Sequence, residues 1–133
     1  MTPIVDLAVW RRLREGVAGA AVGFVPTMGA LHDGHLALIR RSAAENDLTV
    51  VSVFVNATQF NSGADLEAYP RTLDADCRLA AAAGADHVLA PDHASLYPDG
   101  YRYRVTEGEI AAELEGAHRP GHFDGVLTVV LKL

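Results

Sequence analysis

Two runs of apolar residues flank a segment with helical spacing in the first half of the chain. Residues 20–25 are a short apolar run closed by Pro26, and residues 48–55 are rich in β-branched side chains. Between them, residues 35–45 repeat apolar positions at helical spacing. Strands that are apolar on both faces are typical of a parallel sheet covered by helices on each side. The order strand, helix, strand therefore predicts one right-handed βαβ unit.

The same pattern recurs once in the second half. Residues 72–83 place apolar side chains on one helical face, and Gly84 follows as a typical C-terminal cap. We expect Thr72 to be the N-cap of this helix. Residues 86–90 form a third short apolar segment, which Pro91 ends. The predicted fold class is α/β, with a parallel sheet and helices on both of its faces.

The remaining segments give weaker patterns. We expect a turn-rich loop over residues 92–100, an edge strand over residues 101–105 and a short helix over residues 107–114. Residues 123–133 fit a helical stripe, although their valine content is also typical of a strand. We predict a helix for this tail.

Length and composition indicate one globular domain. The chain has 133 residues, of which 50% are hydrophobic and 21% are charged. Its 11 basic and 17 acidic residues give a net charge of −6, which disfavours broad nucleic-acid binding but allows one bound nucleotide. The single cysteine, Cys77, excludes an internal disulfide. The longest apolar run is too short to span a membrane and the start lacks a signal-peptide pattern, so we expect a cytoplasmic protein that binds no membrane.

The junction between the first strand and the first helix carries the richest chemistry. Ligands of open α/β sheets bind at the carboxyl ends of strands, where the free N–H groups of a helix N-terminus attract phosphate. Gly29 and Gly34 would let the backbone approach a ligand, and His32 and His35 can donate hydrogen bonds to a phosphoryl group. The segment is neither a P-loop nor a dinucleotide fingerprint. Two alternatives remain: a tight turn with solvated histidines, and a zinc site that lacks further ligands at suitable spacing.

Four motifs in order then resemble one known family. Pro26-Thr-Met-Gly-Ala-Leu-His-Asp-Gly-His35 resembles the signature of the pantothenate synthetase family, in the nucleotidyltransferase superfamily with its His-x-Gly-His element. The segments Val53-Phe-Val-Asn-Ala-Thr-Gln-Phe60, Tyr69-Pro-Arg-Thr72 and Gly116-Ala-His-Arg-Pro-Gly-His-Phe-Asp-Gly-Val126 are similar to three further family motifs. Together they cover the chain from about residue 20 onward.

The resemblance implies a Rossmann-like fold of the His-x-Gly-His nucleotidyltransferase type and an ATP-dependent ligase activity. In this family the carboxylate of pantoate attacks the α-phosphorus of ATP and expels pyrophosphate. β-Alanine then attacks the pantoyl adenylate, which gives pantothenate and AMP. Mg²⁺ bound to the nucleotide phosphates and a homodimer are also implied.

The resemblance also implies roles for individual residues. The implied catalytic pair is His35, as the proton donor, and His32, against the phosphates. The implied ATP contacts form one continuous segment: Met28, Gly29, Ala30, Leu31, His32, Asp33, Gly34 and His35. The implied pantoate and β-alanine contacts come from three separate motifs: Pro26, Thr27, Met28, Gln59, Phe60, Arg119 and His122. No protein side chain is expected to hold a metal.

The chain also departs from the family pattern. Ala57 replaces a usual proline beside Gln59. Family members run to roughly twice the size of a single domain of this length and continue with a lysine-bearing phosphate-binding element that has no counterpart here. We therefore expect residues 1–133 to be the N-terminal nucleotide- and pantoate-binding domain, with the C-terminal domain absent and negligible ligase activity alone.

Two other functions stay open at this point. The chain could be a non-catalytic remnant that binds nucleotide weakly or only dimerises. It could also be another small nucleotidyltransferase that uses His32 and His35 on a different substrate, although that function leaves Gln59 and the 119–122 turn unexplained.

Overall fold

The computed structural model describes all residues from Met1 to Leu133. Three parallel strands form one sheet in the order β1 (Val22–Thr27), β2 (Leu48–Val53) and β3 (His87–Leu89). At the outer edge of β3, Ile4 adds a single parallel bridge to Leu89. Its N–H donates to the Val88 carbonyl at 2.8 Å, so the edge of the sheet is partly covered by the start of the chain.

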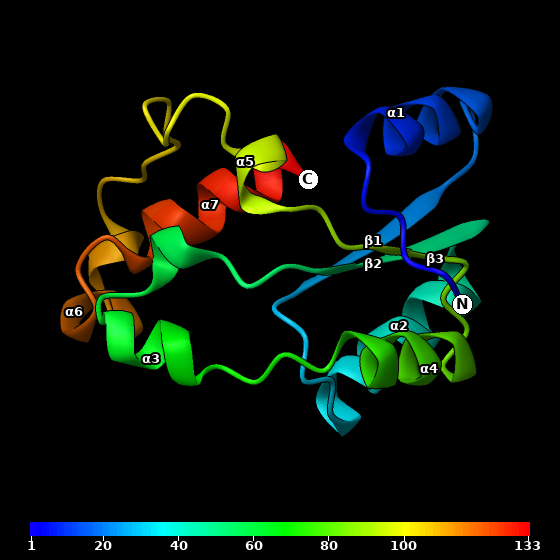
Figure 1. Cartoon of the computed structure of the whole chain (residues 1–133), viewed down its shortest axis with the longest axis horizontal. Helices are drawn as coiled ribbons and strands as arrows, with labels where there is room; N and C mark the ends of the chain where they lie inside the picture. The colour runs from blue at the N-terminus through cyan, green and yellow to red at the C-terminus, as the bar shows by residue number, and fades with distance from the viewer.

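Helices cover both faces of this sheet, as predicted. α2 (Asp33–Glu45) and α4 (Leu73–Ala82) lie on one face, and α1 (Leu7–Gly16) lies on the other (Figure 1). Because side chains alternate across a strand, successive residues of β2 contribute to the hydrophobic cores on the two faces of the sheet. Val51 packs with Ile39 of α2, whereas Val50 packs with Trp10 of α1.

The remaining elements gather beyond the carboxyl ends of the strands (Figure 1). They are η1 (Ala57–Gln59), α3 (Gly63–Ala68), α5 (His93–Leu96), η2 (Ile110–Ala112), α6 (Glu115–His118) and α7 (His122–Lys132). A small core of Phe54, Leu96, Tyr97 and Val129 joins α5 and α7 to the end of β2. None of the helices is long and apolar enough to cross a membrane.

The predicted helices and strands of both βαβ units are confirmed, and the tail forms the predicted helix α7. Gly84 ends the α4 region in a left-handed conformation, with φ of 102°. Thr72 precedes α4 but makes no capping bond. Its hydroxyl instead donates to the Asp76 carboxylate at 3.1 Å. The helices α1 and α3 correspond to no predicted element.

The predicted edge strand over residues 101–105 is wrong. Side chains occupy the N–H groups that a strand would need: the Tyr103 N–H donates to Asp99 and the Val105 N–H donates to Thr128, at 3.0 and 2.9 Å. A strand pairs its backbone groups with a neighbouring strand, and these groups are already satisfied.

Two further expectations need correction. The loop expected over residues 92–100 contains α5, because the Asp92 carboxylate caps it by accepting the Ser95 N–H at 2.7 Å. The helix expected over residues 107–114 is reduced to the turn η2. Here the Glu107 carboxylate accepts the N–H groups of Glu109 and Ala111 and so holds a tighter turn.

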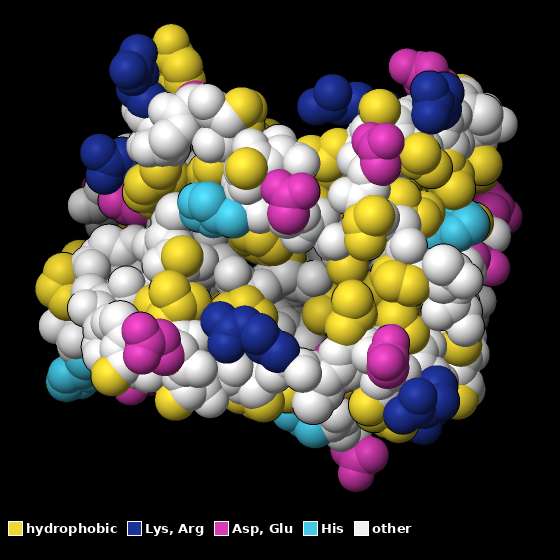
Figure 2. Space-filling view, in the orientation of Figure 1, with side chains coloured by type: hydrophobic (Ala, Val, Ile, Leu, Met, Phe, Trp, Pro, Cys, Tyr) yellow, Lys and Arg dark blue, Asp and Glu magenta, His cyan; other side chains and the backbone are white.

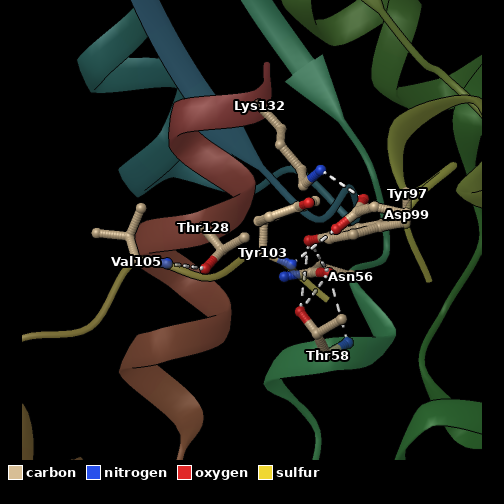
Figure 3. A network of polar contacts seen from close by, with 8 residues as sticks. All are labelled: Asn56, Thr58, Tyr97, Asp99, Tyr103, Val105, Thr128 and Lys132. Atoms are coloured by element: carbon tan, nitrogen blue, oxygen red, sulfur yellow. Dashed lines mark hydrogen bonds and ion pairs between the residues drawn. The ribbon is translucent and has the colours of Figure 1, made fainter. Parts of the chain in front are cut away.

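An ion pair ties the end of α7 to the loop after α5 (Figure 3). Lys132 Nζ lies 2.9 Å from the Asp99 carboxylate, and the two side chains are only 23% and 15% exposed. The hydrogen bonds from Lys132 and from the Tyr103 N–H lower the pKa of Asp99 to about 2. This contact therefore holds the tail helix against the body of the fold.

The ion pair predicts an acid-dependent stability. Because the pKa of Asp99 is lower in the folded than in the unfolded state, its contribution is complete above about pH 4 and is lost as the pH falls to about 2. We expect urea unfolding to show the largest stability difference between the wild type and Asp99→Asn near neutral pH, and only a small one near pH 2, where the folded-state carboxylate is half protonated.

The exposed pair Arg41–Glu45 offers a control, since its side chains are 74% and 57% exposed. Glu45→Gln should change stability little at any pH. A difference between wild type and Asp99→Asn that stays constant from neutral pH to pH 2 would contradict the assigned role of the Asp99 carboxylate.

Candidate active site

A buried carboxylate of α4 holds the loop between β1 and α2 in shape. Gly29 and Ala30 have left-handed backbone conformations, with φ of 83° and 52°. The Asp76 carboxylate, 1% exposed, accepts the N–H groups of Ala30 at 3.1 Å and of Leu31 at 2.8 Å. A Cβ on Gly29 would make a tight contact of 3.0 Å with this carboxylate, so both the backbone conformation and the close approach favour glycine. Asp76 thus fixes the path from the strand to the helix.

The two histidines of the His-x-Gly-His element cap the N-terminus of α2. His32 Nδ1 accepts the Gly34 N–H at 3.2 Å, and His35 Nδ1 accepts the His32 N–H at 3.3 Å. The two rings lie with their centroids 4.0 Å apart. A neutral imidazole that accepts at Nδ1 carries its proton on Nε2. Both Nε2–H groups are therefore free to donate to a ligand.

The expectation of free backbone N–H groups in this loop needs correction. The Gly29 N–H donates to the Thr27 hydroxyl at 3.1 Å, and Asp76 and the two imidazoles take most of the others. These protein acceptors take the place of water, so the N–H groups that they bind are not available to a ligand.

The electrostatic surroundings of His35 favour its neutral form. Burial lowers the pKa of His35, the neighbouring His32 lowers it further, and the Asp76 carboxylate opposes both effects. At neutral pH the ring is thus a hydrogen-bond donor at Nε2 without a full charge. A phosphate beside it would stabilise the cation and raise its pKa.

A cavity of about 250 Å³ opens beside His35, at the carboxyl ends of β1 and β2. Five of the predicted site residues line it: Pro26, Thr27, Met28, His35 and Gln59. The rest of its wall is mostly apolar and comes largely from β2 and α7: Ser52, Phe54, Tyr69, Val126, Val129, Val130 and Leu133. The structure therefore brings residues of all four motifs and of the tail helix around one space.

The Gln59 side chain has a defined orientation in this cavity. The Asn56 amide Nδ2 donates to Gln59 Oε1 and to the Gly125 carbonyl, both at 3.1 Å. The Gly125 carbonyl can only accept, so the amide nitrogen of Asn56 must face it. Gln59 therefore turns its oxygen toward Asn56 and keeps its NH₂ group for a ligand.

The other predicted pantoate contacts lie behind Gln59. His122 Nδ1 is 2.9 Å from the Gln59 backbone oxygen, and an Arg119 Nη donates to the same oxygen at 3.4 Å. With Phe60, His122 lines a separate hollow of about 150 Å³. These three residues do not line the His35 cavity, and Arg119 and His122 hold the backbone that carries Gln59.

Sequence reasoning misses three contributions to the site. The helical pattern places Asp76 only on a helix face, although an acidic residue in an apolar stripe is a signal of a specific partner. Local sequence suggests a turn former at Asn56, whereas its 1% exposed side chain bridges Gln59 and α7. The α7 residues Val129 and Val130 give no signal, because helical periodicity does not reveal which cavity a helix borders.

The charge pattern on one face and the grouping of side chains bear on nucleic-acid and metal binding. Lys, Arg, Asp and Glu side chains are interspersed over the face in Figure 2, which shows no continuous basic patch. No group of three or more His, Cys, Asp or Glu side chains could hold a metal ion. The His32–His35 pair thus has no third ligand nearby, which argues against the zinc alternative.

The comparisons with known proteins all identify the same family. Residues 3–133 match the model of the pantoate-beta-alanine ligase family. The chain is 53% identical to pantothenate synthetase of Bdellovibrio bacteriovorus over 128 residues, which are 96% of this chain and 49% of that protein. It is 56% identical to pantothenate synthetase of Cereibacter sphaeroides over 136 residues, with 100% and 49% coverage.

Solved structures share the fold. Pantoate-beta-alanine ligase from Francisella tularensis, complexed with beta-gamma ATP and beta-alanine, matches with a TM-score of 0.92 and 44% identity, over 99% of this chain and 51% of that chain. Pantothenate synthetase from Thermus thermophilus matches with a TM-score of 0.87 and 48% identity, over 99% and 47%.

The chain spans about half the length of the curated relatives it matches. The match extends over nearly all its residues, and its parallel sheet has the nucleotidyltransferase-type arrangement of the structural neighbours. This agreement favours one family over the alternative of an unrelated small nucleotidyltransferase. From its four motifs, its fold and these similarities, the chain belongs to the pantoate-β-alanine ligase family.

Proposed function

We propose that residues 1–133 form the nucleotide- and pantoate-binding domain of an ATP-dependent ligase that joins pantoate to β-alanine. The observation that carries the proposal is the cavity that brings the His35 imidazole and the Gln59 carboxamide together at the carboxyl ends of two parallel strands. The complex of the Francisella relative with beta-gamma ATP and beta-alanine supports two of the three substrates.

The proposed reaction has two displacements. A pantoate carboxylate oxygen bonds to the α-phosphorus of ATP while the bond to pyrophosphate breaks. The β-alanine nitrogen then attacks the pantoyl carbonyl, loses a proton and displaces AMP, which gives pantothenate. The first displacement, at phosphorus, needs positioning and charge stabilisation more than a protein nucleophile. The Nε2–H groups of His32 and His35 would donate to the phosphate oxygens as negative charge develops.

The cavity offers matching groups to the acid. The NH₂ group of Gln59 can donate to a carboxylate or hydroxyl oxygen of pantoate. The apolar wall from Val129 and Val130 suits its hydrocarbon part. No group of three or more His, Cys, Asp or Glu side chains of this chain would hold Mg²⁺. An Mg²⁺ ion bound by the ATP phosphates would supply neutralisation of their charge.

We also propose that the chain forms a homodimer through an apolar hollow between η2 and α7. Ile110, Leu114, Phe123 and Leu127 line this hollow, and Ile110 and Leu114 are 74% and 85% exposed. Apolar patches of this kind are typical of protein interfaces.

Ligand binding tests the assignment of the two substrates. Calorimetric titration of the 133-residue chain should show saturable binding of ATP and of pantoate. His35→Ala should weaken ATP binding by about tenfold, the equivalent of one lost charge-assisted hydrogen bond. Gln59→Ala should weaken pantoate binding by about tenfold and leave the ATP dissociation constant within about twofold.

His118→Ala is the matched control, since His118 is exposed and does not line the cavity. It should leave both dissociation constants unchanged. If neither ligand binds the wild-type chain saturably, the non-catalytic remnant becomes the better description.

The protonation of His35 gives a second test. In NMR titrations without ligand, its pKa should lie below the ordinary value for histidine, because burial and His32 disfavour the charged ring. Addition of ATP should raise this pKa, since phosphate oxygens stabilise the cation. An unchanged His35 pKa at saturating ATP would show that the phosphates do not contact this ring.

Sedimentation equilibrium tests the dimer. Leu114→Glu places a charge in the apolar hollow and should shift the chain toward the monomer. Leu38→Glu, at a 57% exposed position on α2, should not shift it. A wild-type chain that is monomeric at about 100 μM would rule out this interface as a stable one.

A further inference from the structure

A hydrogen-bonded chain leads from Tyr97, beyond α5, to the carboxamide of Gln59. The Tyr97 side chain is 4% exposed, and its hydroxyl donates to Asn56 Oδ1 at 3.0 Å (Figure 3). The amide nitrogen of the same Asn56 donates to Gln59 Oε1 at 3.1 Å. Tyr97 is thus two hydrogen bonds away from the group that faces the cavity.

The directions of these hydrogen bonds are fixed by neighbouring groups that can only donate, or only accept, a hydrogen bond. Asn56 Oδ1 faces the Thr58 N–H and hydroxyl, at 3.4 and 2.9 Å. An N–H can only donate, so this side of the Asn56 amide must be its oxygen. The Tyr97 hydroxyl adds a donor on that same side. Every contact therefore favours the orientation in which Gln59 presents its NH₂ group to a ligand.

The Tyr97 ring is itself held from several directions. Lys132 Nζ lies 5.1 Å from the ring centroid while it pairs with Asp99. The His93 ring stacks at 4.9 Å, and the ring of Phe54, which lines the cavity, lies at 6.3 Å. Burial raises the pKa of Tyr97, so its hydroxyl keeps its proton at neutral pH. Its position is thus set by β2, α5 and α7 together.

We propose that Tyr97 is a positioning residue of the acid-binding site, which holds Asn56 so that the Gln59 carboxamide points its N–H groups at the substrate carboxylate or hydroxyl. This inference deepens the proposed function and rests on Gln59 as a pantoate contact. Tyr97 itself does not line the cavity, so its effect passes through the two amides.

Tyr97→Phe removes only the hydroxyl and keeps the packed ring. We expect it to weaken pantoate binding by about fivefold to tenfold, the worth of one buried hydrogen bond, and to leave ATP binding within about twofold. The side-chain amide signals of Gln59 and Asn56 should shift in ¹⁵N NMR spectra even without ligand. In the Gln59→Ala background, Tyr97→Phe should cause no further loss, because the two act as one unit.

Tyr103→Phe is the matched control, since the 74% exposed Tyr103 side chain is free of these amides. Equal weakening of ATP and pantoate binding by Tyr97→Phe would overturn the inference in favour of a general structural role. Unchanged pantoate binding, or an additive loss in the double variant, would overturn it as well. A wild-type chain that does not bind pantoate would instead overturn the proposed function, and the ligand-free amide signals would still decide whether Tyr97 orients Gln59.

Discussion

A buried negative charge satisfied by backbone N–H groups is the constraint on which the candidate site depends. Asp76 takes part in no ion pair, and it accepts two N–H groups of the β1–α2 loop and the Thr72 hydroxyl. A buried carboxylate without such donors would be strongly unfavourable, so α4 and the loop must keep their relative positions. The same charge opposes the lowering of the His35 pKa by burial.

The histidines perform two tasks with different ring atoms. Each Nδ1 accepts a backbone N–H at the start of α2, which stabilises the helix end and fixes the ring tautomer. Each Nε2 is left for a ligand. A site built in this way needs little reorganisation when a phosphate arrives, because its donors are already oriented by the fold.

The opposite side of the site is supported by α7. Gly125 lies against η1 so closely that a Cβ there would be 2.7 Å from the Thr58 carbonyl oxygen. This contact lets the Gly125 carbonyl reach Asn56, while Arg119 and His122 hold the Gln59 backbone. Gln59 therefore depends on a helix that follows it by more than sixty residues in the sequence.

Local sequence patterns were enough to predict the alternating strands and helices, the loop with His32 and His35, and the resemblance of four motifs to one family. These features are local: they follow from periodicity, from glycine and proline positions and from short residue patterns. Three features emerge from the folded chain and not from local patterns. Asp76 and the imidazoles accept the loop N–H groups, Arg119 and His122 lie against the Gln59 backbone, and residues 101–105 form no strand. Most of the hydrogen bonds behind these features join groups distant in the sequence: Asp76 with Ala30 and Leu31, Arg119 and His122 with Gln59, and Val105 with Thr128. A local pattern cannot specify which distant partner a polar group will find.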